Sequence, residues 1–127
     1  MTETRTETKS EAAFTLAELS QFTGSEQWYR HRLCRRMLYT DGVKYLAERA
    51  GAYWLIDEIA FAQALPQIAR EEFQVWKLRV EANSADLICE DGNDNAVYRK
   101  RIPFTDFPAP GVEIWCANNV IYLPSEH

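Results

Sequence analysis

The sequence has 127 residues, of which 46% are hydrophobic and 26% charged, and it carries a formal net charge of −5. This length and composition are typical of one globular domain that buries its core without disulfides or metal ions. The negative charge argues against a nucleic-acid partner, and the longest uncharged apolar stretches, residues 50–56 and 59–65, are too short to cross a bilayer. With no export signal in view, we expect a cytoplasmic protein without membrane contact.

The first residues of the chain, MTETRTETKSEAA at 1–13, are polar and lack apolar periodicity. Such a segment cannot offset the entropy cost of ordering, so we predict a disordered tail followed by a single α+β domain at 14–127. Thr15 begins a pattern typical of a capping box, which predicts a short helix that ends near Thr23.

The segment at 28–38, WYRHRLCRRML, fits two patterns. Its apolar residues recur at helical spacing after Leu33, whereas alternation from Tyr29 onward fits a strand. We favour an extended start at 28–32 that turns into a short irregular or helical piece.

Two helices are predicted next. Thr40 or Asp41 can cap a helix that ends at Gly51, a residue suited to the left-handed conformation at a C-terminus. Residues 52–65 are apolar around most of a helical circumference and stop before Pro66, which predicts the central and most buried helix.

After residue 72 the apolar spacing changes from helical to alternating, which indicates strands. Turn sequences, DGNDN at 91–95 and the pair Asn118-Asn119, divide this half into hairpins. We therefore predict an α+β fold in which the N-terminal helices pack on one face of an antiparallel meander sheet of about five strands, formed by the C-terminal half. The predicted strands cover residues 73–80, 86–90, 96–102, 112–117 and 120–123.

Six pieces of the chain resemble segments of a known protein family: FTGSEQWYRH, YTDGVKYLAERAGAYWLIDEIA, FQVWKL, CEDGN, FTDFP and YLPSE. On these pieces, which span nearly all of the chain after the tail, the sequence resembles a family of small bacterial proteins classified as a domain of unknown function. The resemblance implies a self-contained domain in bacteria. It brings no activity, cofactor or catalytic residue with it.

The arginine-rich segment is the first candidate site. Guanidinium groups clamp phosphates and carboxylates through paired hydrogen bonds, and aromatic rings stack on planar ligands. The competing interpretation is a solvated face that balances the acidic residues of the chain. The residues concerned are Trp28, Tyr29, Arg30, Arg32, Arg35 and Arg36.

His31 is one of two histidines in the chain. A lone imidazole can ligate a haem iron, with neighbouring arginines near the propionates, although no covalent attachment motif is present. The competing interpretations are a polar surface residue and a hydrogen-bonded residue at the edge of the core. We predict no cofactor and no metal, and keep haem or another tetrapyrrole, with His31 as its ligand, as an alternative.

Two carboxylates, Asp57 and Glu58, interrupt the most apolar helix. A buried carboxylate there can act as a general acid, but buried charges are more often paired, here with an arginine of the segment at 28–38. Trp54 lies one turn earlier, and the four tryptophans of the chain predict either a shared core between sheet and helices or a ligand cavity. We add Trp54 and Asp57 to the candidate ligand-binding residues.

Three further features have structural interpretations. DGNDNA resembles the start of a calcium loop but lacks its glycine and its final glutamate, so we read a hairpin turn. Asp106 has no catalytic partner that the sequence identifies and fits a turn. The three cysteines are widely spaced, which indicates reduced, partly buried thiols.

No phosphate loop, dinucleotide fingerprint, nucleophile elbow or zinc-protease helix is present. We therefore expect a non-enzymatic binding or regulatory module that acts through a protein partner or as a homodimer. The alternatives are a small-ligand binder, with haem as its concrete form, and an enzyme that uses Asp57, Glu58 or Asp106.

Overall fold

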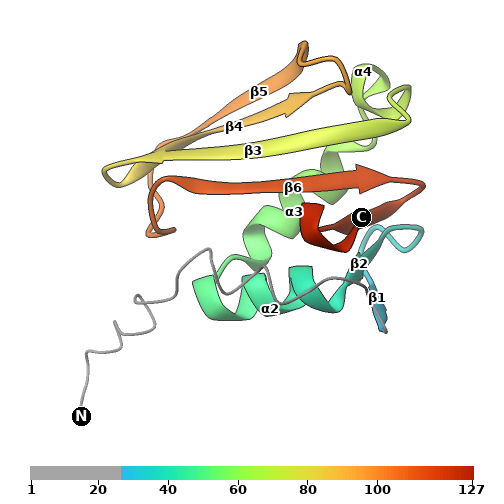
Figure 1. Ribbon diagram of the computed structural model, residues 1–127, viewed down its shortest axis with the longest axis horizontal. Coiled ribbons are helices and arrows are strands. Elements are labelled where there is room, and N and C mark those ends of the chain that lie inside the picture. The colour runs from blue at the N-terminus through green and yellow to red at the C-terminus, as the bar shows by residue number, and fades with distance from the viewer. Residues whose placement is uncertain (1–26) are drawn as a thin grey trace.

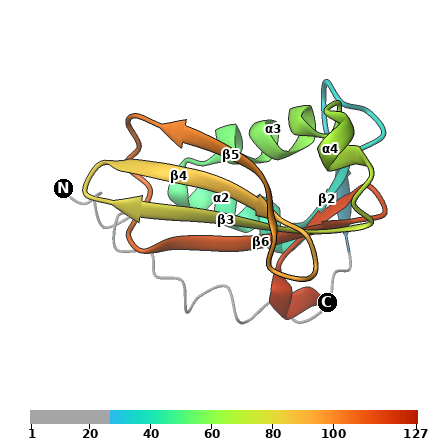
Figure 2. The same cartoon turned by 90° about the horizontal axis from the view of Figure 1, so that it is seen from above.

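The computed structural model describes residues 27–127, which form a mixed sheet of seven strands in the order β1-β2-β7-β6-β3-β4-β5. The two longer helices, α2 and α3, lie together on one side of this sheet (Figures 1 and 2). The predicted tail at 1–13 and the predicted helix after Thr15 lie outside the described residues. The elements are β1 Trp28–Arg30, β2 Leu38–Thr40, α2 Asp41–Ala50, α3 Tyr53–Ala62, α4 Pro66–Ala69, β3 Phe73–Glu81, β4 Ser84–Glu90, β5 Ala96–Ile102, β6 Gly111–Ala117, β7 Val120–Tyr122 and the 3-10 turn η2 Pro124–Glu126.

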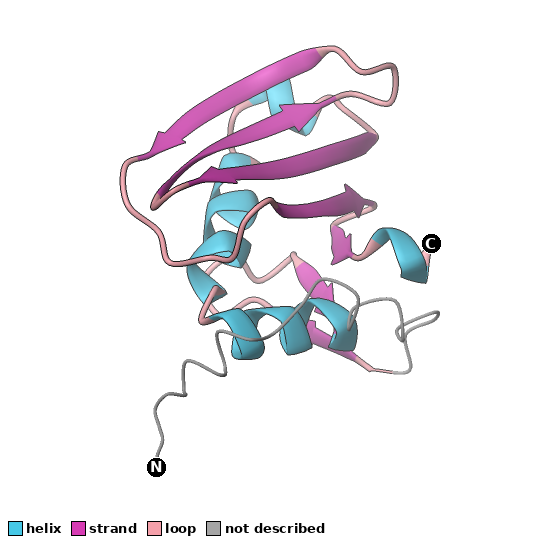
Figure 3. Cartoon of the chain, turned by 60° about the vertical axis from the view of Figure 1, so that its left-hand side comes forward, coloured by secondary structure: helices cyan, strands magenta, loops and turns pink. Residues whose placement is uncertain are grey.

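The predicted five-stranded antiparallel meander from the C-terminal half is wrong. Two strands from the N-terminal half, β1 and β2, extend the sheet beside α2 (Figure 3), and β2 pairs with β7 in parallel, with Leu38 opposite Val120. The strand order is not that of a meander either, because β6 pairs with β3 rather than with β5. Strands of three residues show too little alternation to be recognised, and no local pattern reports that a strand will pair with one some 80 residues away.

The long strands follow the alternation that their sequence shows. In β3, Gln74, Trp76, Leu78 and Val80 are buried, while the residues between them are less so. The predicted hairpin turns are confirmed: β4 pairs with β5 across DGNDN, and β6 pairs with β7 across two asparagines that both have positive φ. Turns of this kind tighten a hairpin because asparagine tolerates the left-handed conformation.

The turn at 91–95 is held by a single carboxylate. Asp91 Oδ1 accepts the backbone N–H groups of Asn93 and Asn95 at 2.8 and 3.0 Å. These hydrogen bonds lower the pKa of Asp91 below its ordinary value, because they stabilise the charged form. The carboxylate is thus occupied in closing the turn.

The caps predicted for the first helix are confirmed. The N–H of Val43 donates to Thr40 Oγ1 at 3.3 Å at the start of α2, and Gly51 ends the helix with φ 62°. The helix predicted at 52–65 is shorter than expected, since α3 ends at Ala62 and a separate turn, α4, starts at Pro66.

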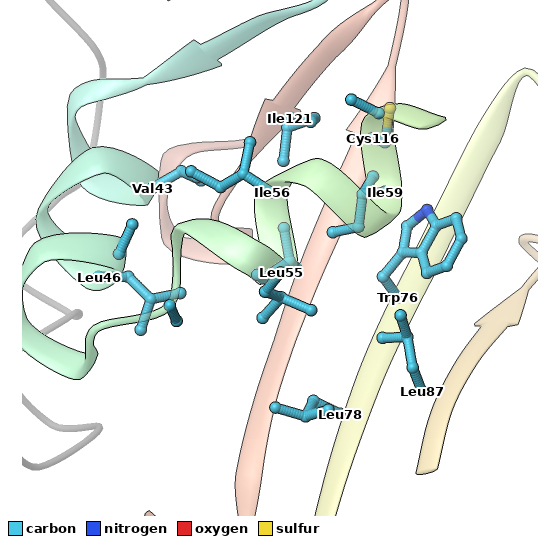
Figure 4. Close-up of a cluster of buried hydrophobic side chains, with 14 of the residues drawn as sticks. Val43, Leu46, Leu55, Ile56, Ile59, Trp76, Leu78, Leu87, Cys116 and Ile121 are labelled. Atoms are coloured by element: carbon cyan, nitrogen blue, oxygen red, sulfur yellow. The ribbon is translucent and has the colours of Figure 1, made fainter. Parts of the chain in front are cut away.

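The core lies between α2, α3 and the sheet (Figure 4). Ile59 and Leu55 of α3 meet Trp76 and Leu78 of β3, and Ile121 of β7 closes the end toward α2. Trp76 is the indole buried in this core, at 1% exposure. The predicted core shared by four tryptophans is therefore wrong: Trp54 and Trp115 are only half-buried, and Trp28 is 57% exposed.

A buried amide pair crosses the core between α3 and β3. Gln63 and Gln74 exchange two side-chain hydrogen bonds of 2.8 and 2.9 Å, and Gln74 Oε1 also accepts the indole N–H of Trp76 at 2.9 Å. Because each polar group has a partner, the pair can be buried without a large desolvation cost.

The C-terminal turn fastens the β2–β7 end of the sheet to α2. Glu126 Oε1 accepts the Thr40 hydroxyl at 2.7 Å and the Leu123 N–H at 2.8 Å, and Oε2 accepts the Gly42 N–H at 3.3 Å. A Cβ at Gly42 would lie 2.7 Å from Oε2, so the absence of a side chain lets the carboxylate approach. The charge also sits at the N-terminus of α2, where a helix favours an anion.

We expect Glu126→Gln to lower the free energy of unfolding by about 1–2 kcal/mol, because the amide has one acceptor oxygen in place of two and no charge. Urea unfolding followed by tryptophan fluorescence measures the effect. The matched control is Glu81→Gln at an exposed position of β3. Equal losses in the two variants would contradict the assigned role of the C-terminal carboxylate.

The three thiols differ in burial, which predicts a difference in reactivity. Burial raises the pKa of Cys89 and of Cys116 to about 12, whereas Cys34 is half-buried in the loop after β1. A thiol with a raised pKa stays protonated at pH 8 and reacts slowly. We expect Ellman's reagent at pH 8 to modify one thiol of the native protein, the Cys34→Ser variant to lose that reaction, and all three thiols to react in urea. Rapid modification of three native thiols would contradict this.

Candidate functional site

The loop between β1 and β2 is organised around His31, which is only 4% exposed although arginines flank it. Its Nδ1 accepts the backbone N–H groups of Leu33 and Cys34 at 3.1 and 2.9 Å, and its Nε2 lies 2.8 Å from Asp57 Oδ1 on α3. A ring nitrogen that accepts hydrogen bonds cannot carry the proton of the neutral imidazole. The network therefore assigns the proton to Nε2, which donates to Asp57.

This arrangement fixes the loop against α3. The main chain also closes on itself, since the His31 N–H donates to the Met37 carbonyl at 2.9 Å. Phe61 of α3 also packs edge-on against the ring, with a centroid distance of 5.7 Å. The segment at 31–37 is thus irregular but held at several points. The extended start predicted at 28–32 is shorter, since β1 ends at Arg30, and of the irregular or helical piece predicted after it the structure has the irregular form.

A hollow of about 610 Å³ lies between this loop and α3. Its walls are mostly apolar, with one arginine and one carboxylate among them. Leu33 and Tyr53, both on its border, and the neighbouring Phe61 are large apolar side chains that remain exposed, Leu33 at 74%. The lining residues are His31, Arg32, Leu33, Tyr39, Tyr53, Ile56 and Asp57.

The structure brings together His31, Arg32 and Asp57 of the nine candidate residues, and it places the others elsewhere. Trp28 borders a second hollow of about 430 Å³ with Tyr122 and His127 near the C-terminus. Trp54 borders a third, of about 440 Å³, between α3 and the end of β5.

The remaining candidates lie in β1 or in the loop after it and do not line the hollow. Tyr29 stacks on Tyr39 with a centroid distance of 5.7 Å, and the Lys44 ammonium lies 5.0 Å from the Tyr29 ring. The Arg30 guanidinium donates to the backbone carbonyl of Arg35. Arg35 and Arg36 are exposed.

The two helix carboxylates have different partners. Glu58 lies 2.9 Å from the Lys100 ammonium of β5, and this hydrogen bond raises the pKa of Lys100. Asp57 pairs with the arginine-rich segment, as one interpretation of the sequence proposed, but through His31 and not through an arginine. Its side chain is 51% exposed, so it is not a buried acid.

Sequence reasoning missed four lining residues: Leu33, Tyr39, Tyr53 and Ile56. Tyr53, Asp57 and Phe61 recur every four residues, and this helical spacing could have grouped the first two with the neighbouring Phe61 on one side of α3. No comparable pattern existed for Tyr39, because β2 is too short to be recognised.

The imidazole of His31 has no lone pair left for chemistry, because Nδ1 accepts two amides and Nε2 donates to Asp57. In this arrangement it cannot act as a general base, and ligation of an iron would first require Nε2 to leave Asp57. In the part of the chain that the structure describes, three or more His, Cys, Asp or Glu side chains nowhere gather as a metal ion requires. None of the helices described between 27 and 127 is long and apolar enough to cross a membrane.

Comparison with known proteins places the chain in a family. The model of a family of unknown function, DUF6876, matches residues 13–127. No curated protein and no solved structure matches the chain.

Two substitutions of His31 separate its two sets of hydrogen bonds. Asparagine places an acceptor near Nδ1 and keeps the loop amides, whereas glutamine reaches Asp57 but leaves those amides without an acceptor. Since an unsatisfied, partly buried N–H is costly while a half-exposed carboxylate is solvated, we expect His31→Gln to lower the free energy of unfolding by about 2–3 kcal/mol and His31→Asn by about 1 kcal/mol.

Urea unfolding measures these losses, and hydrogen exchange of the Leu33 and Cys34 amides tests their cause. Asp57→Asn is the matched control from α3, expected to cost less than His31→Gln. If Asp57→Asn costs as much as His31→Gln, the loop amides do not carry the stabilisation.

Proposed function

We propose that this protein, which belongs to the family of unknown function DUF6876, is a non-enzymatic binding module. Its site is the hollow between the β1–β2 loop and α3, and its ligand is a small molecule with an apolar body. The observation that carries this proposal is the hollow itself, whose volume of about 610 Å³ and largely apolar walls are those of small-molecule sites.

Hydrogen bonds within the chain hold the two walls of the hollow together, which supports binding as its role. The hydrogen bonds of His31 to Leu33, Cys34 and Asp57 hold the loop wall against the helix wall. A preorganised site loses less conformational entropy when a ligand enters, so more of the contact energy becomes affinity.

The candidate catalytic carboxylates do not favour an enzyme. Asp57 holds His31, Glu58 holds Lys100, and Asp106 is exposed beside the third hollow. A general acid needs a shifted proton affinity and a reacting group in reach, and none of these three carboxylates is buried without a charged or imidazole partner.

A protein partner or a second copy of the chain is the second candidate for this surface. Leu33, Tyr53 and Phe61 expose large apolar areas at the hollow, and exposed apolar patches rimmed by charge mark interaction surfaces. A tetrapyrrole is a third and weaker form of the proposal, since His31 would have to give up Asp57 to bind iron.

A titration with N-phenyl-1-naphthylamine, an uncharged dye that fluoresces in apolar surroundings, tests the small-ligand site. We expect saturable binding that Leu33→Ser weakens by about tenfold, because burial of one leucine side chain contributes about that factor. Phe104→Ser, at a similarly exposed position beside the third hollow, is the matched control and should bind as the unmodified protein does. Absence of saturable binding, or equal weakening by both substitutions, would refute the site.

Light scattering on the same samples separates the second candidate from the first. If Leu33 sits in a homodimer contact, Leu33→Ser shifts the molar mass from dimer to monomer. A monomer in both proteins, with dye binding retained in the unmodified chain, favours the small ligand. Haem titration supplies the third comparison: a Soret shift that His31→Ala abolishes would favour the tetrapyrrole.

A further inference from the structure

We infer that the ligand of the hollow is zwitterionic, a free amino acid or short peptide whose ammonium meets Asp57, whose carboxylate meets Arg32 and whose apolar side chain packs against the apolar lining. This inference rests on the proposed function. The ligand then has an ammonium and a carboxylate group in addition to its apolar body.

The negative group of the hollow is Asp57. The His31 ring donates to Oδ1 only, so the carboxylate has a second oxygen that the imidazole does not bind. Within residues 27–127, that second oxygen has no hydrogen-bond partner, and the side chain is half-exposed. A carboxylate in this state can accept hydrogen bonds from an ammonium group.

The positive group comes from the opposite wall. Arg32 lines the hollow from the loop and is exposed, and between residues 27 and 127 no carboxylate forms an ion pair with it. A guanidinium fork matches the two oxygens of a carboxylate.

Apolar surface connects the two charged groups. Leu33, Tyr39, Tyr53 and Ile56 make up the rest of the lining together with the buried ring of His31. A ligand with only an anionic group would leave Asp57 unmatched, and one with only a cationic group would leave Arg32 unmatched. A zwitterion with an apolar side chain satisfies all three features at once.

The two other hollows bordered by candidate residues lack this combination. In the third, Glu58 and Lys100 already neutralise each other at 2.9 Å. In the second, the carboxylate of Glu126 is occupied by Thr40, Gly42 and Leu123. The hollow at His31 differs from both: among the described residues, Arg32 has no carboxylate partner and one oxygen of Asp57 accepts no hydrogen bond.

Displacement of N-phenyl-1-naphthylamine from the full chain at pH 7 tests the inference with three compounds of one skeleton. L-phenylalanine carries both charges, 3-phenylpropionate lacks the ammonium, and 2-phenylethylamine lacks the carboxylate. We expect L-phenylalanine to displace the dye at a concentration about tenfold lower than either analogue, the factor that one lost charge-assisted hydrogen bond represents. L-phenylalanyl-L-phenylalanine, compared with L-phenylalanine, distinguishes a peptide ligand from a free amino acid.

Two isosteric substitutions then test the assigned partners. Asp57→Asn still accepts from His31, and it should remove the advantage of L-phenylalanine over 3-phenylpropionate. Arg32→Gln should remove the advantage over 2-phenylethylamine. Arg36→Gln, on the same loop but outside the lining, is the control and should leave both advantages unchanged.

The outcomes separate the inference from the function on which it rests. If the dye does not bind in the hollow, the proposed function fails and the inference with it. If the dye binds but neither zwitterion outcompetes both one-charge analogues, or if Asp57→Asn and Arg32→Gln leave the preference intact, the inference is wrong and the apolar site stands. A preference for 3-phenylpropionate over both zwitterions would overturn it in favour of an anionic ligand.

Discussion

The parallel pairing of β2 with β7 is the constraint on which the arrangement of this protein depends. It joins a strand that ends at residue 40 to one that begins at residue 120, and Glu126 reinforces the joint by binding Thr40 and Gly42. Because α2 starts directly after β2, this joint also sets where the helical layer begins. The loop before β2 is thereby carried to the side of the sheet where α3 lies.

The same joint explains how an arginine-rich segment can contain a buried histidine. Once β1 and β2 pair, the residues between them must fold back over a short distance, and the amides of Leu33 and Cys34 need an acceptor away from water. His31 supplies it with one nitrogen and uses the other to bind Asp57. The arginines around it remain in solvent, where their charge costs little.

The hollow beside His31 lies between the loop and α3, which the hydrogen bonds of His31 connect. The histidine hydrogen bonds and the buried Ile56 hold its walls together, while Arg32, Leu33 and Tyr53 are exposed. The hollow thus combines walls held by hydrogen bonds with an exposed guanidinium and one carboxylate oxygen that His31 does not bind.

Several features could be predicted from the sequence because they depend on interactions between residues close together in the chain. Thr40 and Gly51 bound α2, the alternation from Phe73 marks β3, and Asp91 closes its turn, because in each case the interacting groups lie within a few residues of one another. The pairing of β2 with β7 and of β3 with β6, the burial of His31, its contact with Asp57 and the contact of Glu126 with Thr40 were decided by the tertiary structure. Their partners lie 26 residues apart for His31 and Asp57 and 86 apart for Thr40 and Glu126, and no local pattern of polarity records a contact over such a separation.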